Sequence, residues 1–157
     1  MSMCKTLAAT ILAGTMLFAG SAAAADKAPS GTTASKDGKA MELVQEWDKV
    51  FPRSDKVEHR KVTFRTRYGT VLAGDLYVPR DARGKLAALA VSGPFGAVKE
   101  QASGLYAQTM AERGFLTLAF DPSYTGESSG EPRHVASPDI NTEDFSAAVD
   151  FLSLIHI

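Results

Sequence analysis

Two short, uninterrupted apolar runs on either side of a segment with helical periodicity constrain the fold of this chain more than any other feature. Residues 86–91 read LAALAV and residues 115–120 read FLTLAF. Runs of this kind are typical of strands covered on both faces in a parallel sheet. Between the two runs, residues 103–113 predict a helix, and Gly114 follows in the position of a helix C-cap. The sequence therefore predicts a β-α-β unit. The expected apolar face of its helix consists of Leu105, Tyr106, Met110 and Ala111.

An alternating segment precedes this unit and predicts an antiparallel hairpin. Polar and apolar residues alternate over residues 61–68, which indicates a strand with one buried face and one solvated face. Gly69-Thr70 supplies the turn, and residues 71–78 form the return strand, which Pro79 ends.

After the second apolar run, the chain is loop-like from Asp121 to Pro138, a stretch rich in Gly and Pro. A further helix is then expected to begin at Asn141 or Thr142. Its apolar residues recur at helical spacing and are Phe145, Ala148, Val149 and Leu152.

Residues 1–25 predict a Sec-type secretory signal peptide. Lys5 precedes an apolar run over residues 7–19, and Ala23 and Ala25 are the small residues that signal peptidase requires. The apolar run is shorter than the roughly 20 residues that a membrane-spanning helix needs. We therefore expect cleavage, a mature protein in the periplasm or outside the cell, and no membrane association after cleavage.

The mature chain is expected to start with a disordered linker over residues 26–40. This stretch holds no large apolar side chain, so it cannot bury enough surface to become ordered. Residues 41–51 carry Met41, Val44 and Trp47 at helical spacing and predict a short amphipathic helix. A single domain is expected over residues 41–157.

Charge and cysteine content exclude several classes of function. The 17 Lys and Arg residues nearly balance the 18 Asp and Glu residues, which argues against a nucleic-acid-binding domain or a polybasic membrane-surface protein. Cys4 is the only cysteine and lies in the predicted signal peptide, so no disulfide framework or Cys-ligated zinc site is expected. The histidines, His59, His134 and His156, are too scattered to suggest a metal cluster.

Glycine-containing loops follow both apolar runs. The first reads Ser92-Gly93-Pro94-Phe95-Gly96, and the second begins at Asp121 and reads D-x-x-x-x-G-x-S. On residue types alone, the glycines of the first loop indicate a sharp turn off the strand. The carboxylate of Asp121 is expected to accept hydrogen bonds from N–H groups of residues 124–128.

The order and spacing of these segments resemble the N-terminal half of an α/β-hydrolase, in the branch of the dienelactone hydrolases and acyl peptidases. The matching stretches are residues 69–79 (GTVLAGDLYVP), 89–101 (LAVSGPFGAVKEQ) and 106–130 (YAQTMAERGFLTLAFDPSYTGESSG), and the resemblance covers about residues 57–152. It implies an incomplete α/β fold in which an antiparallel hairpin leads into a parallel sheet with flanking helices. It further implies hydrolysis of an ester or related acyl bond in a small-molecule substrate, without a cofactor.

In that family, the loop after the first buried strand supplies a backbone N–H group to the oxyanion hole. The family loop usually reads H-G-x, whereas Ser92 stands in place of the histidine here. Proline has no N–H group, so Pro94 cannot donate, and the expected donors are Phe95 and, after it, Gly96. The residues expected at the rim of the site are Ser92, Gly93 and Asp121.

Residues 126–130 match G-x-S-x-G, the pattern of a nucleophile elbow, but their context does not fit one. An elbow requires a buried strand that runs directly into the first glycine and a helix that begins at the serine. Here residues 122–126 separate the strand end from Glu127, and Pro132 follows where a helix should continue. We therefore do not assign Ser128 as the nucleophile, although Asp144 and His156 follow it in the order of a hydrolase triad.

No catalytic residue is assigned, because the elbow, acid and histidine of the family are expected beyond Leu152. One-domain α/β-hydrolases usually have on the order of 200 to 250 residues, whereas 157 − 25 leaves 132 here after export. We expect an N-terminal fragment that is inactive alone, whose last residues, 153–157, are either the start of the next strand or unrelated to the gene.

Two other functions stay open at the level of sequence. A dinucleotide-binding domain would also place a glycine loop after a buried strand and an acid, Asp121, at the end of the next. The loop reads G-x-x-G rather than G-x-G-x-x-G, and Pro94 removes one amide group, which both disfavour this interpretation. The other possibility is a non-catalytic binding protein on a hydrolase scaffold.

Overall fold

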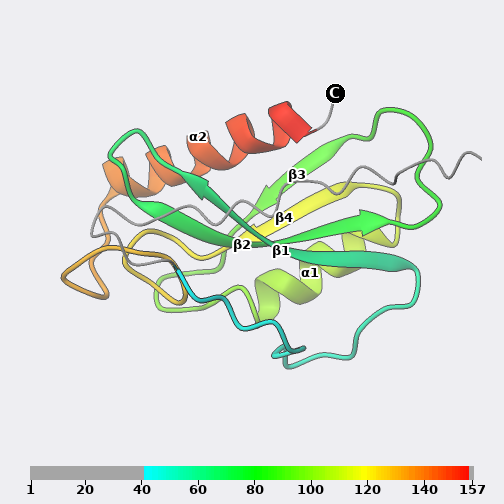
Figure 1. Cartoon of the computed structure of the whole chain (residues 1–157), viewed down its shortest axis with the longest axis horizontal. Helices are drawn as coiled ribbons and strands as arrows, with labels where there is room; N and C mark the ends of the chain where they lie inside the picture. Colours follow the sequence, from blue (N-terminus) through cyan, green and yellow to red (C-terminus); the bar gives the residue numbers. More distant parts are fainter. Residues whose placement is uncertain (1–40, 156–157) are drawn as a thin grey trace, which may run out of the picture.

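The computed structural model describes residues 41–155, which form a four-stranded mixed sheet between two helices (Figure 1). The predicted signal peptide and linker lie outside the described residues. The strand order is β1-β2-β4-β3, in which β3 and β4 are parallel and the other neighbours antiparallel. The elements are β1 (Val57–Arg65), β2 (Val71–Pro79), β3 (Ala88–Val91), α1 (Ala102–Ala111), β4 (Leu116–Phe120) and α2 (Pro138–Ile155).

The predicted hairpin is confirmed. Strands β1 and β2 pair antiparallel over their whole length, from Val57 opposite Pro79 to Arg65 opposite Val71. Gly69 in the connecting turn has a φ of 88°, a backbone conformation that glycine adopts without strain. Residues 71–77 of β2 are buried on both faces, because β2 lies between β1 and β4.

The predicted β-α-β unit is also confirmed, with Ala88 opposite Leu116 and Val91 opposite Ala119 in the parallel pair. Strand β4 is buried throughout, as expected. The same expectation is wrong for β3, which is an edge strand of the described sheet and leaves Ala88 exposed and Leu89 half-buried.

Helix α1 packs on the sheet through small and polar residues rather than through its large apolar ones. Leu105 and Tyr106, which we expected to face the core, are exposed, whereas Ala111 is buried as predicted. At Gly104 the helix lies close to the 41–51 segment, since a Cβ atom there would lie 3.1 Å from Cζ of Phe51. The small residues on this face let the helix lie close to the sheet. The buried face consists of Ser103, Gly104, Ala107, Gln108 and Ala111.

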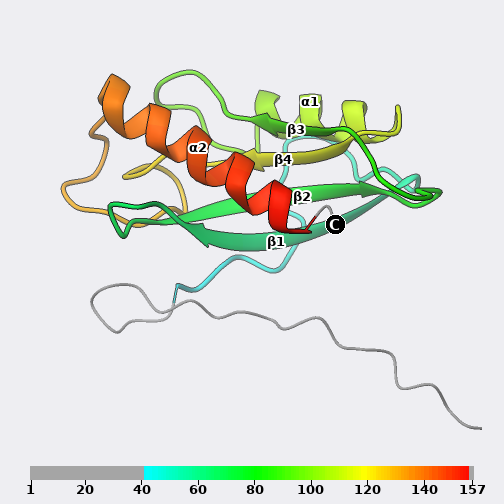
Figure 2. The same ribbon diagram turned by 90° about the horizontal axis from the view of Figure 1, so that it is seen from above.

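Helix α2 begins earlier than predicted and presents a rotated face. Ser137 accepts a hydrogen bond on Oγ from Ile140 N (3.2 Å), and Pro138 occupies the first helical position, where its missing N–H group has no cost. Figure 2 shows the helix lying obliquely across the strands. Ala148 and Leu152 are buried as expected, but Phe145 and Val149 of the predicted face are exposed.

The two helices cover opposite faces of the sheet (Figure 1), which we call the α1 face and the α2 face. The core of the α2 face consists of Phe64, Leu72, Leu76, Leu116, Leu118, Phe120, Ala147, Ala148 and Leu152. The smaller core of the α1 face consists of Phe51, Val57, Tyr77, Ala107, Ala111 and Ala119.

The helix predicted over residues 41–51 is wrong, because this segment contains no regular secondary structure. Lys49 and Phe51 are buried while Val50 between them is exposed, an alternation typical of extended chain. Trp47 Nε1 donates to Phe51 O (2.8 Å), and Val50 N donates to Glu100 O (3.2 Å). The segment is therefore held by contacts to the folded domain rather than by its own hydrogen bonds.

Candidate functional site

The candidate site is built from two loops that follow the parallel strands at their carboxyl ends. The first, which we call the 92–101 loop, joins β3 to α1, and the second, the 121–130 loop, follows β4. Because β3 and β4 run in the same direction (Figure 1), both loops leave the same edge of the sheet. In open α/β sheets this edge is where ligands bind.

The 92–101 loop contains a tight turn over residues 94–97, which we call the oxyanion turn after the role that the sequence resemblance implies for it. Ala97 N donates to Pro94 O (3.0 Å), and Gly96 has a φ of 80°, as in a type II turn. Phe95 at its tip is 77% exposed. Among residues 41–155, the amide groups of Phe95 and Gly96 donate to no protein acceptor. The two residues predicted as available donors therefore carry two unpartnered N–H groups.

Ser92 and Gly93 join this turn to the end of β3. Ser92 donates from Oγ to the carbonyl oxygen of Phe120 (3.3 Å), which links the loop to the end of β4. A Cβ atom on Gly93 would lie only 2.9 Å from Cβ of Ala97, so the chain approaches itself too closely there for a side chain. Both residues lie in the loop that carries the turn.

A residue that sequence analysis did not single out, Lys99, connects the two loops. Its backbone N donates to Asp121 Oδ1 (2.8 Å), and its Nζ donates to Asp121 Oδ2 (2.8 Å). Nζ also donates to Glu127 Oε2 (2.7 Å) and Glu100 Oε1 (2.5 Å). The Lys99 and Asp121 side chains are both fully buried.

Asp121 is a structural carboxylate, as the sequence suggested. Besides the two bonds from Lys99, it accepts one on Oδ2 from the backbone N of Glu127 (3.0 Å), inside the predicted range of loop donors. Gly126 is required beside it, because a side chain there would collide with the carboxylate. The buried, occupied oxygens of Asp121 also speak against a ribose-binding role in a dinucleotide site.

Residues 126–130, the G-x-S-x-G match, form part of the 121–130 loop and not an elbow. Ser128 Oγ accepts from Ala73 N (2.9 Å) and donates to Asp121 O (2.7 Å), so the hydroxyl is buried between two backbone groups. Ser129 exchanges two further hydrogen bonds with the backbone of Val71. No helix follows until Pro138.

The acid of the apparent triad, Asp144, is bonded to Ser123 and not to Ser128. Asp144 is buried and accepts from Ser123 N (2.8 Å) and Ser123 Oγ (2.7 Å), which fixes the start of the 121–130 loop to α2. His156 lies outside the described residues. His59 bonds to Asp75 from Nε2 (2.8 Å).

Further buried charges extend from Lys99 across the α1 face. Lys61 on β1 donates to Glu127 Oε2 (2.7 Å) and Asp48 Oδ2 (2.9 Å), so the predicted solvated face of β1 is partly covered. Lys49 Nζ lies 3.0 Å from Asp75 Oδ2, and both side chains are fully buried. We call the whole set the charged cluster. It consists of Asp48, Lys49, His59, Lys61, Asp75, Lys99, Glu100, Asp121 and Glu127.

Mutual attraction outweighs burial in setting the pKa values of this cluster. Burial opposes the charge of Lys99, but the carboxylates around it, Asp121 above all, raise the pKa of Lys99 above its ordinary value. Burial likewise opposes ionisation of Glu127, yet hydrogen bonds from Lys61 and Lys99 lower its pKa. Lys99 and Glu127 are therefore both charged at neutral pH, and their ion pair helps to hold the two loops together.

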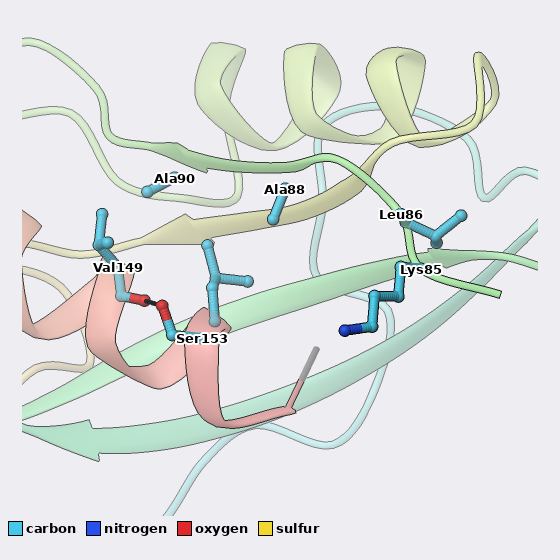
Figure 3. Close-up of a pocket in the computed structure, with 7 residues that line it drawn as sticks. Lys85, Leu86, Ala88, Ala90, Val149 and Ser153 are labelled. Atoms are coloured by element: carbon cyan, nitrogen blue, oxygen red, sulfur yellow. Dashed lines mark hydrogen bonds between the residues drawn. The ribbon is translucent and has the colours of Figure 1, made fainter. Parts of the chain in front are cut away.

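A groove of about 420 Å³, lined by both apolar and polar side chains, lies away from these loops, between β3 and α2 (Figure 3). Val149 and Ser153 of α2 and Ala88 and Ala90 of β3 line it, and Lys85 closes one end. Ser153 donates from Oγ to Val149 O (2.9 Å), so its hydroxyl is occupied within the helix. The groove offers apolar surface beside an edge strand but no group suited to acyl chemistry.

Other kinds of site were sought in the same residues. Across residues 41–155, no group of His, Cys, Asp and Glu side chains has an arrangement that could hold a metal ion. No helix in that range combines the length and apolarity needed to cross a bilayer.

Comparisons with known proteins relate the chain to hydrolases. No family model matches it. It is 70% identical over 131 residues to the uncharacterized protein PA2218 of Pseudomonas aeruginosa, covering 81% of this chain and 35% of that protein. The crystal structure of PA2218 aligns with a TM-score of 0.72 and 74% identity, over 74% of this chain and 36% of that one.

Two further relatives carry hydrolase names. The thiohydrolase aneE of Aspergillus aculeatus is 36% identical over 99 residues, which are 63% of this chain and 30% of that protein. The α/β hydrolase GrgF from a Penicillium species aligns with a TM-score of 0.54 and 30% identity, over 61% of this chain and 32% of that one. The chain spans about a third of the length of these relatives. It is therefore related to the α/β-hydrolase superfamily, and its described residues form part of the α/β-hydrolase fold.

Proposed function

We propose that the protein is a secreted or periplasmic hydrolase of ester or thioester bonds, in which the amide groups of Phe95 and Gly96 bind the oxyanion. The observation that carries this proposal is the oxyanion turn, which presents two unpartnered N–H groups at the carboxyl end of β3. Oriented backbone donors of this kind stabilise negative charge without having to reorganise during the reaction.

The proposed step is acyl transfer to an enzyme nucleophile. The nucleophile adds to the carbonyl carbon, and the π electrons of the carbonyl move onto its oxygen, which the two amide groups then hydrogen-bond. When the tetrahedral intermediate collapses, the carbonyl re-forms, the bond to the leaving group breaks, and the alkoxide or thiolate takes up the proton that the nucleophile gave up. Water then adds to the acyl-enzyme, which releases the carboxylic acid and returns the proton to the nucleophile. The described residues contribute the anion-binding side of this reaction, and we assign the nucleophile to none of them.

The relatives named as thiohydrolases support including thioesters among the substrates. The test compares hydrolysis of p-nitrophenyl acetate with that of a short acyl thioester by the full-length protein. The mature chain ending at residue 157 should hydrolyse neither. Rapid turnover by residues 26–157 alone would contradict this assignment, because it would require a nucleophile among residues that we excluded.

One substitution tests the oxyanion role directly. Phe95→Pro removes the N–H group, and turns of this type accept proline at their second position. We expect kcat to fall about 100- to 1000-fold in the full-length protein. Phe95→Ala is the matched control, since it removes the exposed ring but keeps the amide, and it should stay within a few-fold of wild type. Equal activity of the two variants would refute the role of this amide.

The proposed localisation needs a separate measurement. Expression of the full-length protein in a Gram-negative host, followed by fractionation and N-terminal mass analysis, should give a periplasmic protein that begins at Asp26. An intact Met1 in the soluble cytoplasmic fraction would contradict export by this segment.

A further inference from the structure

The oxyanion turn is fixed to the end of β4 at two points, one on each side of it. Before the turn, Ser92 Oγ donates to Phe120 O (3.3 Å), and after it, Lys99 N donates to Asp121 Oδ1 (2.8 Å). Phe120 and Asp121 are consecutive residues, so both ends of the segment that carries the turn meet at one point of the sheet. The position of the two free amide groups therefore depends on these attachments.

The second attachment is the stronger of the two, because its acceptor is a buried carboxylate with a charged partner. Hydrogen bonds that involve an ionised group are shorter and stronger than those between neutral groups. The positive charge of Lys99 Nζ, which lies 2.8 Å from Asp121 Oδ2, compensates the negative charge of the carboxylate that accepts the backbone bond. One residue thus supplies both the backbone donor that holds the loop and the ammonium group that pairs with the same buried carboxylate.

Lys99 also has an electrostatic consequence for the site. Asp121 directly follows the strand next to the one from which the oxyanion turn departs, and it is bonded to the loop that carries the turn. A like charge that is left uncompensated in a buried environment disfavours a second anion. The ammonium group of Lys99, which pairs with Asp121, reduces that repulsion.

We propose that Lys99 is a positioning residue of the oxyanion turn, which holds Phe95 and Gly96 in place through Asp121 and shields the site from the charge of that carboxylate. This inference rests on the proposed function, since it names the residue that sets the geometry of the proposed oxyanion donors. Glu127 supports it as the second carboxylate on Lys99 Nζ, and it links the pair to Lys61 on β1.

The test uses a double substitution, because Lys99→Met alone would leave Asp121 as an unpaired buried charge and disturb folding. Lys99→Met with Asp121→Asn removes both charges; the asparagine oxygen can still accept the backbone bond of residue 99, while the bond from Glu127 N to Oδ2 is lost. Lys49→Met with Asp75→Asn is the matched control, a buried Lys–Asp pair of equal exposure that contacts neither loop.

Two readouts are measured in the full-length protein: deuterium uptake of peptides from residues 92–101, and kcat and KM for an aryl ester. For the Lys99/Asp121 variant, we expect faster uptake in this loop and a fall in kcat of about 10- to 100-fold, with KM within about twofold. The control should change neither readout in the loop.

Three results would overturn the inference: unchanged uptake in the Lys99/Asp121 variant, faster uptake with an unchanged kcat, or an equal response in the control. Failure of the proposed function looks different. The wild-type protein would then show no turnover of esters or thioesters, while the uptake comparison would still report whether Lys99 holds the loop.

Discussion

The two faces of the sheet are stabilised in different ways. The α2 face is covered by aromatic and aliphatic side chains, among which the ring of Phe64 lies 5.2 Å from that of Phe151 and 6.0 Å from that of Phe120. The α1 face has a core of small side chains and, beside it, fully buried charges such as Lys49 and Asp75. The first face depends on area removed from water, and the second on matched charge.

The two faces should therefore respond differently to substitutions. An apolar core loses stability in proportion to the volume removed, and neighbouring side chains relax into part of the space. A buried ion pair behaves otherwise, because removal of one partner leaves the other charged and without compensation. The candidate site lies at the end of the charged region. The two loops that carry it are therefore also expected to lose stability when one partner of the Lys99–Asp121 pair is removed.

The largest effect is expected from breaking one ion pair on the α1 face. Lys49→Met should lower the free energy of unfolding by about 3 to 5 kcal/mol, because it leaves the buried carboxylate of Asp75 with His59 as its remaining partner. Urea denaturation followed by circular dichroism measures the change. Adding Asp75→Asn should recover most of the loss, and a double variant as unstable as the single one would show that charge matching is not what holds this face.

A cavity on the α2 face should cost somewhat less. Leu118 is fully buried, and Leu118→Ala is expected to destabilise the chain by about 3 kcal/mol. Unlike the ion-pair variant, it should respond little to salt or pH in the same denaturation assay. Val149→Ala, an exposed position on α2, serves as the comparison, and a similar loss there would mean that the groove beside β3 is covered.

Acid should weaken the α1 face first. Burial favours the neutral form of Asp48, but Lys49 and Lys61 outweigh it and lower its pKa to about 2. The pKa values of Asp75 and Glu127 are also lowered. These groups bind protons more weakly in the folded than in the unfolded chain, so their stabilisation is present above about pH 4 and is lost as the pH falls toward 2.

Urea midpoints between pH 6 and pH 2 would detect this loss. Asp48→Asn should flatten the plot of urea midpoint against pH at its acid end. Asp144→Asn should not, since burial raises the pKa of Asp144, so that protonation of this group favours the folded state. A midpoint that stays constant down to pH 2 would contradict a charge-stabilised α1 face.

The smallest effect concerns one neutral contact on the same face. Thr117 donates from Oγ1 to the carbonyl oxygen of Ala107 (2.8 Å), a buried bond between β4 and α1. Thr117→Val should cost about 1 kcal/mol in the free energy of unfolding. Thr109 makes a similar bond to Leu105 O at the protein surface, and Thr109→Val should stay within about 0.5 kcal/mol of wild type.

The fold was predictable from sequence where a period of two or an uninterrupted apolar run governs burial. The hairpin and the β-α-β unit follow from such patterns and are confirmed. The helix faces were predicted less well, because polar contacts override the apolar pattern. In α2, Asp144 turns inward to bind Ser123, and Phe145 next to it is left exposed.

Of the candidate site, the sequence predicted the backbone turn but not the buried side chains that hold it. The glycines and the exclusion of Pro94 led to Phe95 and Gly96, whose turn is present, whereas Lys99 was missed because charged residues usually lie in solvent. For the other buried lysine, Lys49, Asp75 offered a signal, since an acid in the middle of an apolar strand requires a buried partner. Sequence alone gives no means of choosing which distant lysine supplies it.

The position of Trp47 gives the protein a built-in optical reporter. It is the only tryptophan in the chain, and its indole packs edge-on against the rings of Phe51 and His59, at 5.7 and 5.2 Å. Lys49 Nζ lies 5.6 Å from the same ring. Tryptophan fluorescence of the 157-residue chain therefore reports on the small-residue core of the α1 face and on the ion pairs beside it. The α2 face has no tryptophan and gives no such signal.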